Sequence, residues 1–340
     1  MKSPEEMAQV AFSRREAYKK EKEEREYRRE TFCRRASAIT MAVLCVVVLG
    51  VGGVLAATLD LGDLFQSFFS IRQGSSLSKN QTTYIEEHIA DIGESVTQDG
   101  YTVTLKGALT DGTTAHILVD IIAPEGQNIE SIEPGFYLDI CNMVQEGQED
   151  AHIYSVSTTF YSIPDNDGKE NTRTVLMLYN IYGSNFSLAD GRKRDLYLSD
   201  IWYVENEYPY TFNIVTEGPW HFEFAFDAVD DREVELLKAP IHSSYTQISG
   251  ELVNAKITSF LMKGLSATIH YTLTPGAVQE AGDFGAIKFV MKDGSVYNAY
   301  PKKAGQTTNN CHYCTYVFEA PISIEDVVSV YIGENEINIS

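Results

Sequence analysis

The feature that most limits the fold of this chain is one long stretch without charged side chains. Residues 36–59 are 24 consecutive positions without Asp, Glu, Lys or Arg. A helix rises ~1.5 Å per residue, so about 20 apolar residues cross the hydrocarbon core of a bilayer. Signal peptides have a shorter apolar stretch, of roughly 7–15 residues, behind a short basic start. We therefore predict a transmembrane helix at 36–59; a cleaved signal ending near Val54-Leu55-Ala56 is the alternative.

The charges beside this window predict the orientation of the helix. Four arginines lie between residues 28 and 35, whereas the first basic residue after the window is Arg72. Lys and Arg beside a membrane span remain on the cytoplasmic side. We therefore expect a single-pass protein of the cell membrane, with the lipid bilayer as a partner. Its N-terminus is predicted to be cytoplasmic and residues 60–340 to be extracellular.

The balance of acidic and basic residues also differs between the N-terminal segment and the rest of the chain. Residues 1–37 hold 11 basic and 8 acidic side chains, which leaves 16 of the 27 basic and 40 of the 48 acidic residues for the rest of the chain. A surface with so many carboxylates repels the phosphate backbone of DNA and RNA. The composition therefore predicts no nucleic acid partner for the exported part.

The predicted cytoplasmic segment, residues 1–35, is rich in Glu, Lys and Arg at helical spacings, which predicts one charged helix. Its apolar side chains gather near the start and include Met7, Val10 and Phe12. Two interpretations are open. Either the helix is solvated beside the membrane, or this patch contacts a cytoplasmic regulatory protein.

The segment after the membrane is predicted to be a linker, residues 60–80, followed by a short helix. Thr83 and Glu86 have the spacing of a capping box, and Gly93 provides a stop signal. The sequence therefore predicts a helix over 83–93 that packs on the strands that follow.

Strands dominate the rest of the sequence. Apolar and polar residues alternate in runs such as "YTVTLKGALT" and "PWHFEFAFDA", and Asp111-Gly112 between two runs predicts a hairpin turn. Two such series occur. We therefore predict a mainly β fold, with a single transmembrane helix followed by two antiparallel β-sandwich (Ig-like) domains. The first domain, 81–230, includes the short helix, and the second spans 231–340, with a boundary anywhere from 229 to 250.

Cys311 and Cys314 form the motif "CHYC", whose spacing also occurs in metal and redox sites. A structural zinc site needs about four ligands. A redox pair normally opens a helix, whereas a strand pattern continues here. We therefore predict no metal and no cofactor. The two cysteines either form a small disulfide or are both free thiols.

The segment "WYVENEYPY" combines aromatic and acidic side chains, a mixture that sugar-binding surfaces use. Its aromatic residues are Trp202, Tyr203, Tyr208 and Tyr210. They are candidates for binding a glycan or another envelope component, and ordinary packing is the alternative. Motifs of the Gly-x-Ser-x-Gly and His-Glu-x-x-His types do not occur in the sequence, which therefore predicts no catalytic residues and no enzyme.

The segment "IGESVTQDGYTVTLKGALTDGTTAHILVDI", residues 92–121, follows the charged head, the predicted span and the predicted helix. This layout resembles a family of single-pass bacterial membrane proteins with an uncharacterised exported β-rich domain, often encoded beside extracytoplasmic-function sigma factors. The segments 289–300 and 322–339 share a looser similarity. The resemblance implies an anti-sigma-like or envelope-sensing role.

We therefore expect a membrane-anchored sensory or regulatory protein outside a Gram-positive type of cell, without catalytic activity. The alternative is an anchored surface protein that binds carbohydrate or the cell wall. The two interpretations differ in which side of the membrane carries the function.

Overall fold

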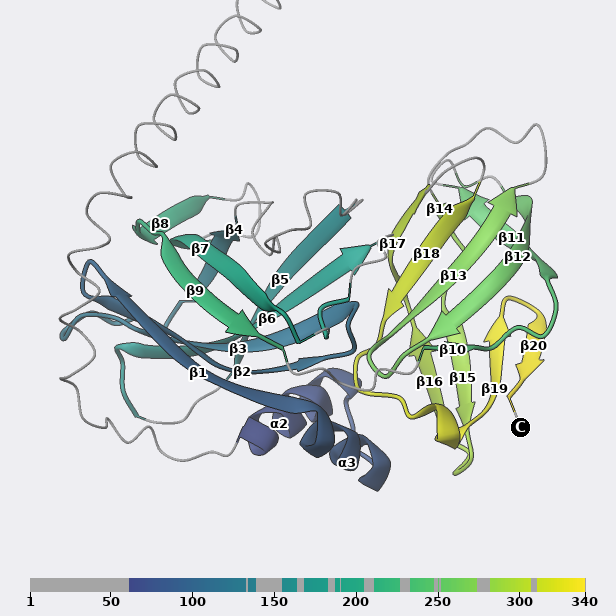
Figure 1. Ribbon diagram of the computed structural model, residues 1–340, viewed down its shortest axis with the longest axis horizontal. Coiled ribbons are helices and arrows are strands. Elements are labelled where there is room, and N and C mark those ends of the chain that lie inside the picture. Colours follow the sequence, from purple (N-terminus) through teal and green to yellow (C-terminus); the bar gives the residue numbers. More distant parts are fainter. Residues whose placement is uncertain are drawn as a thin grey trace, which may run out of the picture. The chain divides into compact units, whose positions relative to one another are not determined.

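Antiparallel sheets make up most of the structure (Figure 1). The computed structural model describes residues 61–340 except 133, 139–154, 164–167, 183–186, 190, 205–210, 227–232, 248–249, 251, 274–281, 307–310 and 340. Two α-helices accompany the sheets in this part of the chain, so the predicted mainly β class is confirmed. The predicted transmembrane helix lies outside the described residues, and within them no helix is long and apolar enough to cross a membrane.

The segment predicted to be a linker, residues 60–80, is largely helical instead. It contains helix α2 (Leu61–Gln73) and the start of helix α3 (Lys79–His88). The buried side chains of α2 are Leu64, Phe65, Phe68 and Phe69. Full burial of a side chain of this size stabilises a fold by about 1.5–3 kcal/mol. The segment is therefore part of the core and not a tether.

Helix α3 begins and ends earlier than predicted. The Ser78 hydroxyl accepts a hydrogen bond from the backbone N–H of Gln81 at 3.2 Å, and the Gln81 side chain accepts one from the Ser78 N–H at 2.8 Å. This capping box replaces the one predicted at Thr83 and Glu86, which is wrong. The helix stops at His88 because Ile89 pairs with a neighbouring strand, which the helical spacing of isoleucines did not indicate.

Sheet A has five antiparallel strands in the order β1-β2-β3-β6-β5. They are β1 (Ile89–Gln98), β2 (Tyr101–Thr110), β3 (Thr114–Ile122), β5 (Ser155–Ile163) and β6 (Thr172–Tyr182). The predicted turn at Asp111-Gly112 joins β2 to β3, and Gly112 has the positive φ of 78° that such a turn favours. β3 is buried along almost its whole length, so both faces of the sheet are covered.

Sheet B shares a core with sheet A. Its strands are β4 (Pro134–Leu138), β7 (Lys193–Val204), β8 (Phe212–Thr216) and β9 (Trp220–Ala225), and β7 pairs with the other three. In β9, buried and exposed residues alternate strictly, as the sequence predicts for a core-facing strand. The first core includes Val103, Ile117, Val119, Leu196, Trp220 and Phe222.

Two further antiparallel sheets form the C-terminal half. Sheet C contains β10 (Val234–Glu235), β11 (Ile241–Gln247), β12 (Leu252–Met262), β13 (Ser266–Leu273), β14 (Gly282–Asp283), β17 (Pro301–Gln306) and β18 (His312–Val317). Sheet D contains β15 (Ile287–Met291), β16 (Val296–Ala299), β19 (Val327–Ile332) and β20 (Asn335–Asn338), and the 3₁₀ helix η1 (Ile324–Asp326) precedes β19. The order in sheet C is β14-β11-β12-β13-β18-β17 with β10 beside β12, and in sheet D it is β16-β15-β19-β20. The second core includes Phe260, Ile269, Phe289 and Val330.

The change from the first core to the second falls between Phe226 and Leu236. The boundary predicted between residues 230 and 231 lies in a stretch that the structure does not describe. The two halves are not separate, since the chain from residue 58 onwards forms one compact unit.

A third apolar cluster joins the helices to both halves. Its members from the helices are Leu64, Phe65, Phe68, Phe69 and Ile85. Those from the outer face of sheet A are Leu109, Leu118, Ile163, Leu176 and Leu178. Leu265, Val317 and Ala320 come from the C-terminal half. The helices therefore cover sheet A and contact the second half at the same place.

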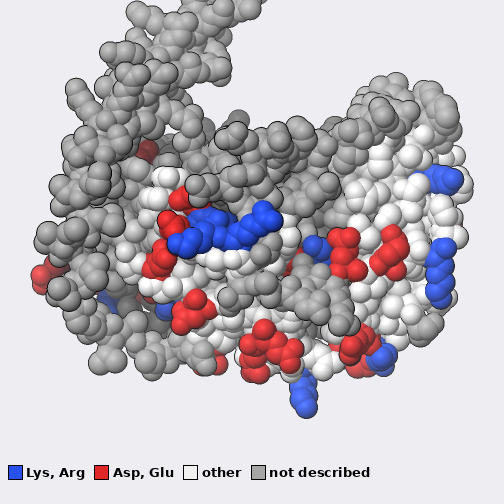
Figure 2. Space-filling view, viewed as in Figure 1, with Lys and Arg blue, Asp and Glu red and all other residues white. Residues whose placement is uncertain are grey.

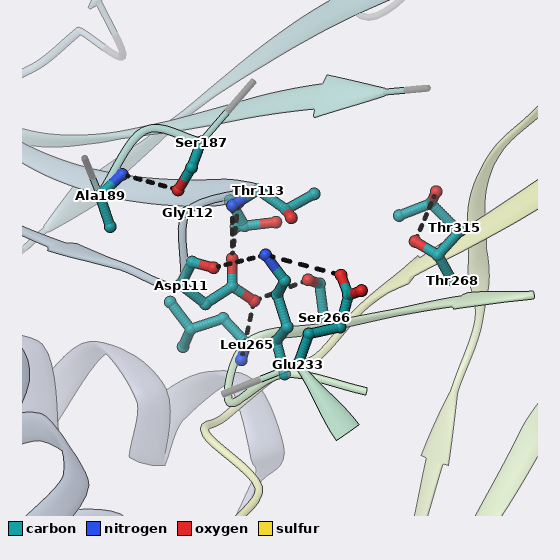
Figure 3. Close-up of polar contacts among 12 residues, drawn as sticks. Asp111, Gly112, Thr113, Ser187, Ala189, Glu233, Leu265, Ser266, Thr268 and Thr315 are labelled. Carbon is teal, nitrogen blue, oxygen red and sulfur yellow. Dashed lines mark hydrogen bonds and ion pairs between the residues drawn. The ribbon is translucent and has the colours of Figure 1, made fainter. Parts of the chain in front are cut away.

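A buried carboxylate, that of Asp111, forms hydrogen bonds to both halves at this junction (Figure 3). The Oδ1 atom of Asp111 accepts hydrogen bonds from the N–H groups of Thr113 at 3.0 Å and Thr114 at 2.7 Å. Its Oδ2 atom accepts from the N–H of Leu265 at 3.1 Å and from the hydroxyl of Ser266 at 2.6 Å. Asp111 is 0% exposed, so water does not compete for these bonds. The side chain therefore ties the β2–β3 turn to the β12–β13 turn.

The substitution Asp111→Ala is expected to lower the free energy of unfolding by about 3–5 kcal/mol, because it leaves buried donors from both turns without an acceptor. Urea denaturation of the full-length chain would measure this. Glu125→Ala removes an exposed carboxylate in a turn and serves as the control, with a change of about 0.5 kcal/mol or less. Equal effects of the two substitutions would contradict the structural role of Asp111.

A glycine in the β12–β13 turn lets α3 approach. A Cβ atom at Gly264 would overlap the ring of Tyr84, a side chain of α3 that also stacks on His88 with ring centroids 3.9 Å apart. The backbone carbonyl of Gly264 accepts a hydrogen bond from the N–H of Ile322 at 2.8 Å. Moving the turn away from α3 would strain this bond. Close packing of α3 therefore requires glycine at this position.

We expect Gly264→Ala to destabilise the fold by about 1–3 kcal/mol through overpacking. In a Tyr84→Ala background the same substitution should change stability by less than about 1 kcal/mol, since the overlapping ring is gone. A double-mutant cycle by urea denaturation tests both statements. Additive effects of the two substitutions would show that the ring and the turn do not compete for space.

Candidate functional site

A hollow of about 250 Å³ lies where the start of α3 meets sheet D. Residues 78–81 line one side of it. The other side is lined by Met291, Lys292, Asp293, Ser295, Tyr297, Pro321, Ser323 and Asp326. We call this hollow the α3 groove. A second hollow of about 240 Å³ shares Tyr297 and is bordered by Gln73 at the end of α2.

Local hydrogen bonds fix the walls of the α3 groove. Asp293 accepts from the N–H of Ser295 at 2.8 Å and from its hydroxyl at 2.6 Å, and these bonds lower the pKa of Asp293. Gly294 follows with a φ of 85°, which glycine adopts without strain. The side-chain amide of Asn80 donates to the carboxylate of Asp326 at 2.6 Å. This last bond joins α3 directly to η1, which lies beside it in Figure 1.

Gln81 connects the α3 groove to both helices. Its side-chain amide donates to the Oε1 atom of Gln73 at 3.1 Å and to the backbone carbonyl of Pro321 at 3.0 Å. Only 5% of Gln81 is exposed, so these bonds are shielded from water. A displacement of the groove wall would therefore act on α2 as well as on α3.

The α3 groove offers several kinds of polar group to a ligand. Its lining provides ammonium groups (Lys79, Lys292), carboxylates (Asp293, Asp326), an amide and hydroxyls, with the ring of Tyr297 at one side. Nowhere in the described part of the chain do three or more His, Cys, Asp or Glu side chains gather as metal ligands would. The volume is below the roughly 300–1,000 Å³ of sites for drug-sized ligands. The groove therefore suits a small polar ligand or the end of a longer one.

Charged side chains form small separate groups on the face drawn in Figure 2. Acidic side chains form several separate groups there, and basic side chains lie beside some of them. On β7 and β9, Lys193 pairs with Glu223, and His221 contacts Asp195 at 2.6 Å. These pairs are largely exposed, and such pairs contribute about 0–1 kcal/mol each. They mark a solvated sheet face.

The predicted aromatic site is only partly covered by the structure. Trp202 and Tyr203 are partly exposed neighbours on β7, where Trp202 lies opposite Gly135 of β4 and Tyr203 opposite Pro134. Successive side chains of a strand point to opposite faces, so these two rings do not form one stacking surface. Tyr208 and Tyr210 lie outside the described residues, as do the predicted cytoplasmic contacts Met7, Val10 and Phe12.

In the structure no disulfide joins Cys311 to Cys314, which was one of the two states that the sequence left open. Cys314 lies in β18 and Cys311 immediately precedes this strand. Three residues of extended chain separate two Cα atoms by about 10 Å, whereas a disulfide requires about 4.4–6.8 Å. Cys314 is 0% exposed, and burial raises the pKa of its thiol to about 12.

The α3 groove was not predicted from the sequence. Its walls come from three stretches, near residues 79, 293 and 323, and only the Asp293-Gly294 pair between two strands gives a turn signal. The segments 289–300 and 322–339 both contribute residues to it.

Among known protein families, one has a model that matches part of this chain. Residues 30–123 match DUF4179, a domain of unknown function. The match includes α2, α3 and the first three strands, and it confirms the expectation of an uncharacterised domain in this part of the chain. No curated protein matches. Among solved structures, the crystal structure of the conserved domain protein from Bacillus anthracis is 12% identical, with a TM-score of 0.46, over 71% of this chain and 75% of that chain.

The thiols give a direct test of the packing around β18. In the native protein at pH 8, iodoacetamide should leave Cys314 unmodified, because a buried thiol with a raised pKa supplies almost no thiolate. Cys311, which is partly exposed, should be alkylated. Peptide mass spectrometry distinguishes the two positions, and unfolding in guanidinium chloride should make Cys314 reactive. Alkylation of both at equal rates in the native protein would contradict the structure.

Proposed function

We propose that the chain is a membrane-anchored sensory module of the bacterial envelope that binds a small polar ligand at the α3 groove and regulates a cytoplasmic partner. It does so without catalysis. In this proposal two β-sandwich (Ig-like) domains, 81–230 and 231–340, lie outside the cell, and residues 36–59 cross the membrane. The cytoplasmic contact is the patch of Met7, Val10 and Phe12. The family resemblance makes regulation linked to an extracytoplasmic-function sigma factor the expected output.

One observation carries this proposal: the first described element after the predicted span is part of the fold. α2 begins at Leu61, and its Phe65 and Phe69 are 0% exposed in the third apolar cluster. A flexible tether would isolate the exported fold from the membrane. A helix that is packed into both halves instead moves when they move.

The contacts of the α3 groove support a connection from ligand to helix. Asn80 and Gln81, which line the groove, bond to Asp326 and to Pro321 in the C-terminal half. Gln81 also bonds to Gln73 of α2. A ligand that changes the spacing between η1 and α3 would therefore shift α2, whose other end adjoins the predicted span.

The chemistry of the groove favours a glycan or another polyhydroxylated envelope component as the ligand. Carboxylates, amides and ammonium groups bond to hydroxyls, and an aromatic ring such as Tyr297 packs on the apolar face of a sugar. Soluble fragments of the cell's own wall glycan are the first probe to use.

The proposal predicts that crosslinking in intact cells, followed by pull-down, recovers a cytoplasmic partner with the full chain and not with a chain lacking residues 1–30. The amount recovered should change when wall fragments are added. A flexible insertion of six Gly and Ser residues between Asp60 and Leu61 should keep the partner and abolish that change. The same insertion beside the exposed Gly126, where the surroundings are open, is the control and should preserve the response.

Two results would overturn the proposal. Recovery of the same partners with and without residues 1–30 would show that the head only inserts the chain into the membrane. A response that survives the insertion before α2 would show that the helix does not transmit it.

A further inference from the structure

A histidine is buried beneath α2. His116 of β3 is 0% exposed, and the residues opposite it on the two neighbouring strands are Leu109 and Leu178. From α2, Phe69 meets its ring edge-on with centroids 5.0 Å apart, and Phe68 does so at 6.0 Å. The ring is therefore enclosed by apolar side chains of the sheet and of the helix.

Packing alone does not account for a histidine at this position. Within the described residues, neither ring nitrogen of His116 has a hydrogen-bond partner. Buried polar atoms are normally paired, because an unpaired donor or acceptor loses its hydrogen bonds to water. A leucine or phenylalanine would fill this place without that loss. What distinguishes histidine is that it titrates near neutral pH.

The charged groups around His116 disfavour its protonation, which would add a positive charge near that of Arg72. Arg72 of α2 lies near His116, with its guanidinium 5.5 Å from the ring centre of Phe68 and 4.8 Å from that of Tyr161 in β5. Asp111 in the β2–β3 turn is engaged by its four donors. Asp120, on the same face of β3, pairs with Lys106 at 3.2 Å. Leu109 and Leu178 on the neighbouring strands carry no charge, so no described carboxylate is available to stabilise a protonated ring.

We propose that His116 is an acid-sensitive latch for α2, which is held on sheet A while the ring is neutral and is released when the ring takes up a proton. The release breaks no covalent bond. It requires only that α2, with Phe68, Phe69 and Arg72, moves off the ring and admits water. The latch operates whatever ligand the α3 groove takes, and it adds a second input to the same helix.

The direction of the effect follows from linkage. Burial, and secondarily Arg72, lower the pKa of His116 to about 3 in the docked state, and an undocked ring approaches the ordinary value of about 6.5. A lowered pKa stabilises the docked state above about pH 6.5, and this stabilisation is lost as the pH falls. Between pH 7 and pH 5 the equilibrium constant for undocking should rise about 25-fold.

Hydrogen–deuterium exchange of the full-length chain in detergent tests this latch. After correction for the intrinsic pH dependence of exchange, the amides of residues 61–73 should open about 25-fold more often at pH 5 than at pH 7, and those of β2 and β3 should change less. His116→Phe, which keeps a ring of similar shape, should make opening of α2 independent of pH. His242→Gln, at an exposed position, should behave as the unaltered chain does.

Three outcomes of the exchange experiment would overturn the proposal. In the first, the opening of α2 in the unaltered chain does not depend on pH. In the second, the His116→Phe variant has the same pH dependence as the unaltered chain. In the third, α2, β2 and β3 lose protection equally, which would indicate global unfolding. His116→Leu provides a second variant if phenylalanine disturbs the core, and both must match the unaltered chain at pH 7. Nuclear magnetic resonance of the unaltered chain adds a direct readout, since a ring that is protonated while α2 stays docked at pH 5 also excludes the latch.

Discussion

The junction between the two halves of the fold depends on the four hydrogen bonds to the Asp111 carboxylate. Two donors belong to its own turn, and two belong to a turn 154 and 155 positions later in the chain. A buried carboxylate without donors strongly destabilises a fold, whereas one with four donors fixes both turns in place. Leu265, which supplies one donor, is also a member of the third apolar cluster. The polar and apolar parts of the junction therefore form together.

The two helices take their positions from this junction. α2 fills the outer face of sheet A, and Tyr84 of α3 packs on Gly264 beside the Asp111 contacts. Gln81 then links both helices to Pro321. In the proposed sensory role, two inputs act on these helices, a ligand at the polar wall of the α3 groove and the protonation of His116. A helix that adjoins a predicted membrane span is well placed to combine them.

The sequence predicted what depends on neighbouring residues and missed what depends on distant ones. Alternation in "WHFEFA" and the turn at Asp111-Gly112 are local signals, and both were correct. The donors of Asp111 lie in another hairpin, so its role as a clamp could not be read from the turn. The apolar side chains of α2 lie in a segment that was predicted to be a linker, because the sequence does not show that their partners Leu118 and Leu178 come from later strands. The α3 groove is assembled from three separate stretches, none of which is distinctive alone.

The bond between Gln81 and Pro321 joins residues 240 positions apart, and this separation has a consequence for biogenesis. Synthesis from the N-terminal end produces α2 and α3 long before Val317 and Ala320, which complete their cluster. Until the last strands arrive, the phenylalanines of α2 have an incomplete cover and are exposed to aggregation. Helices α2 and α3 thus reach their final packing only with the last strands, so a fully docked α2 indicates that the whole chain has been made.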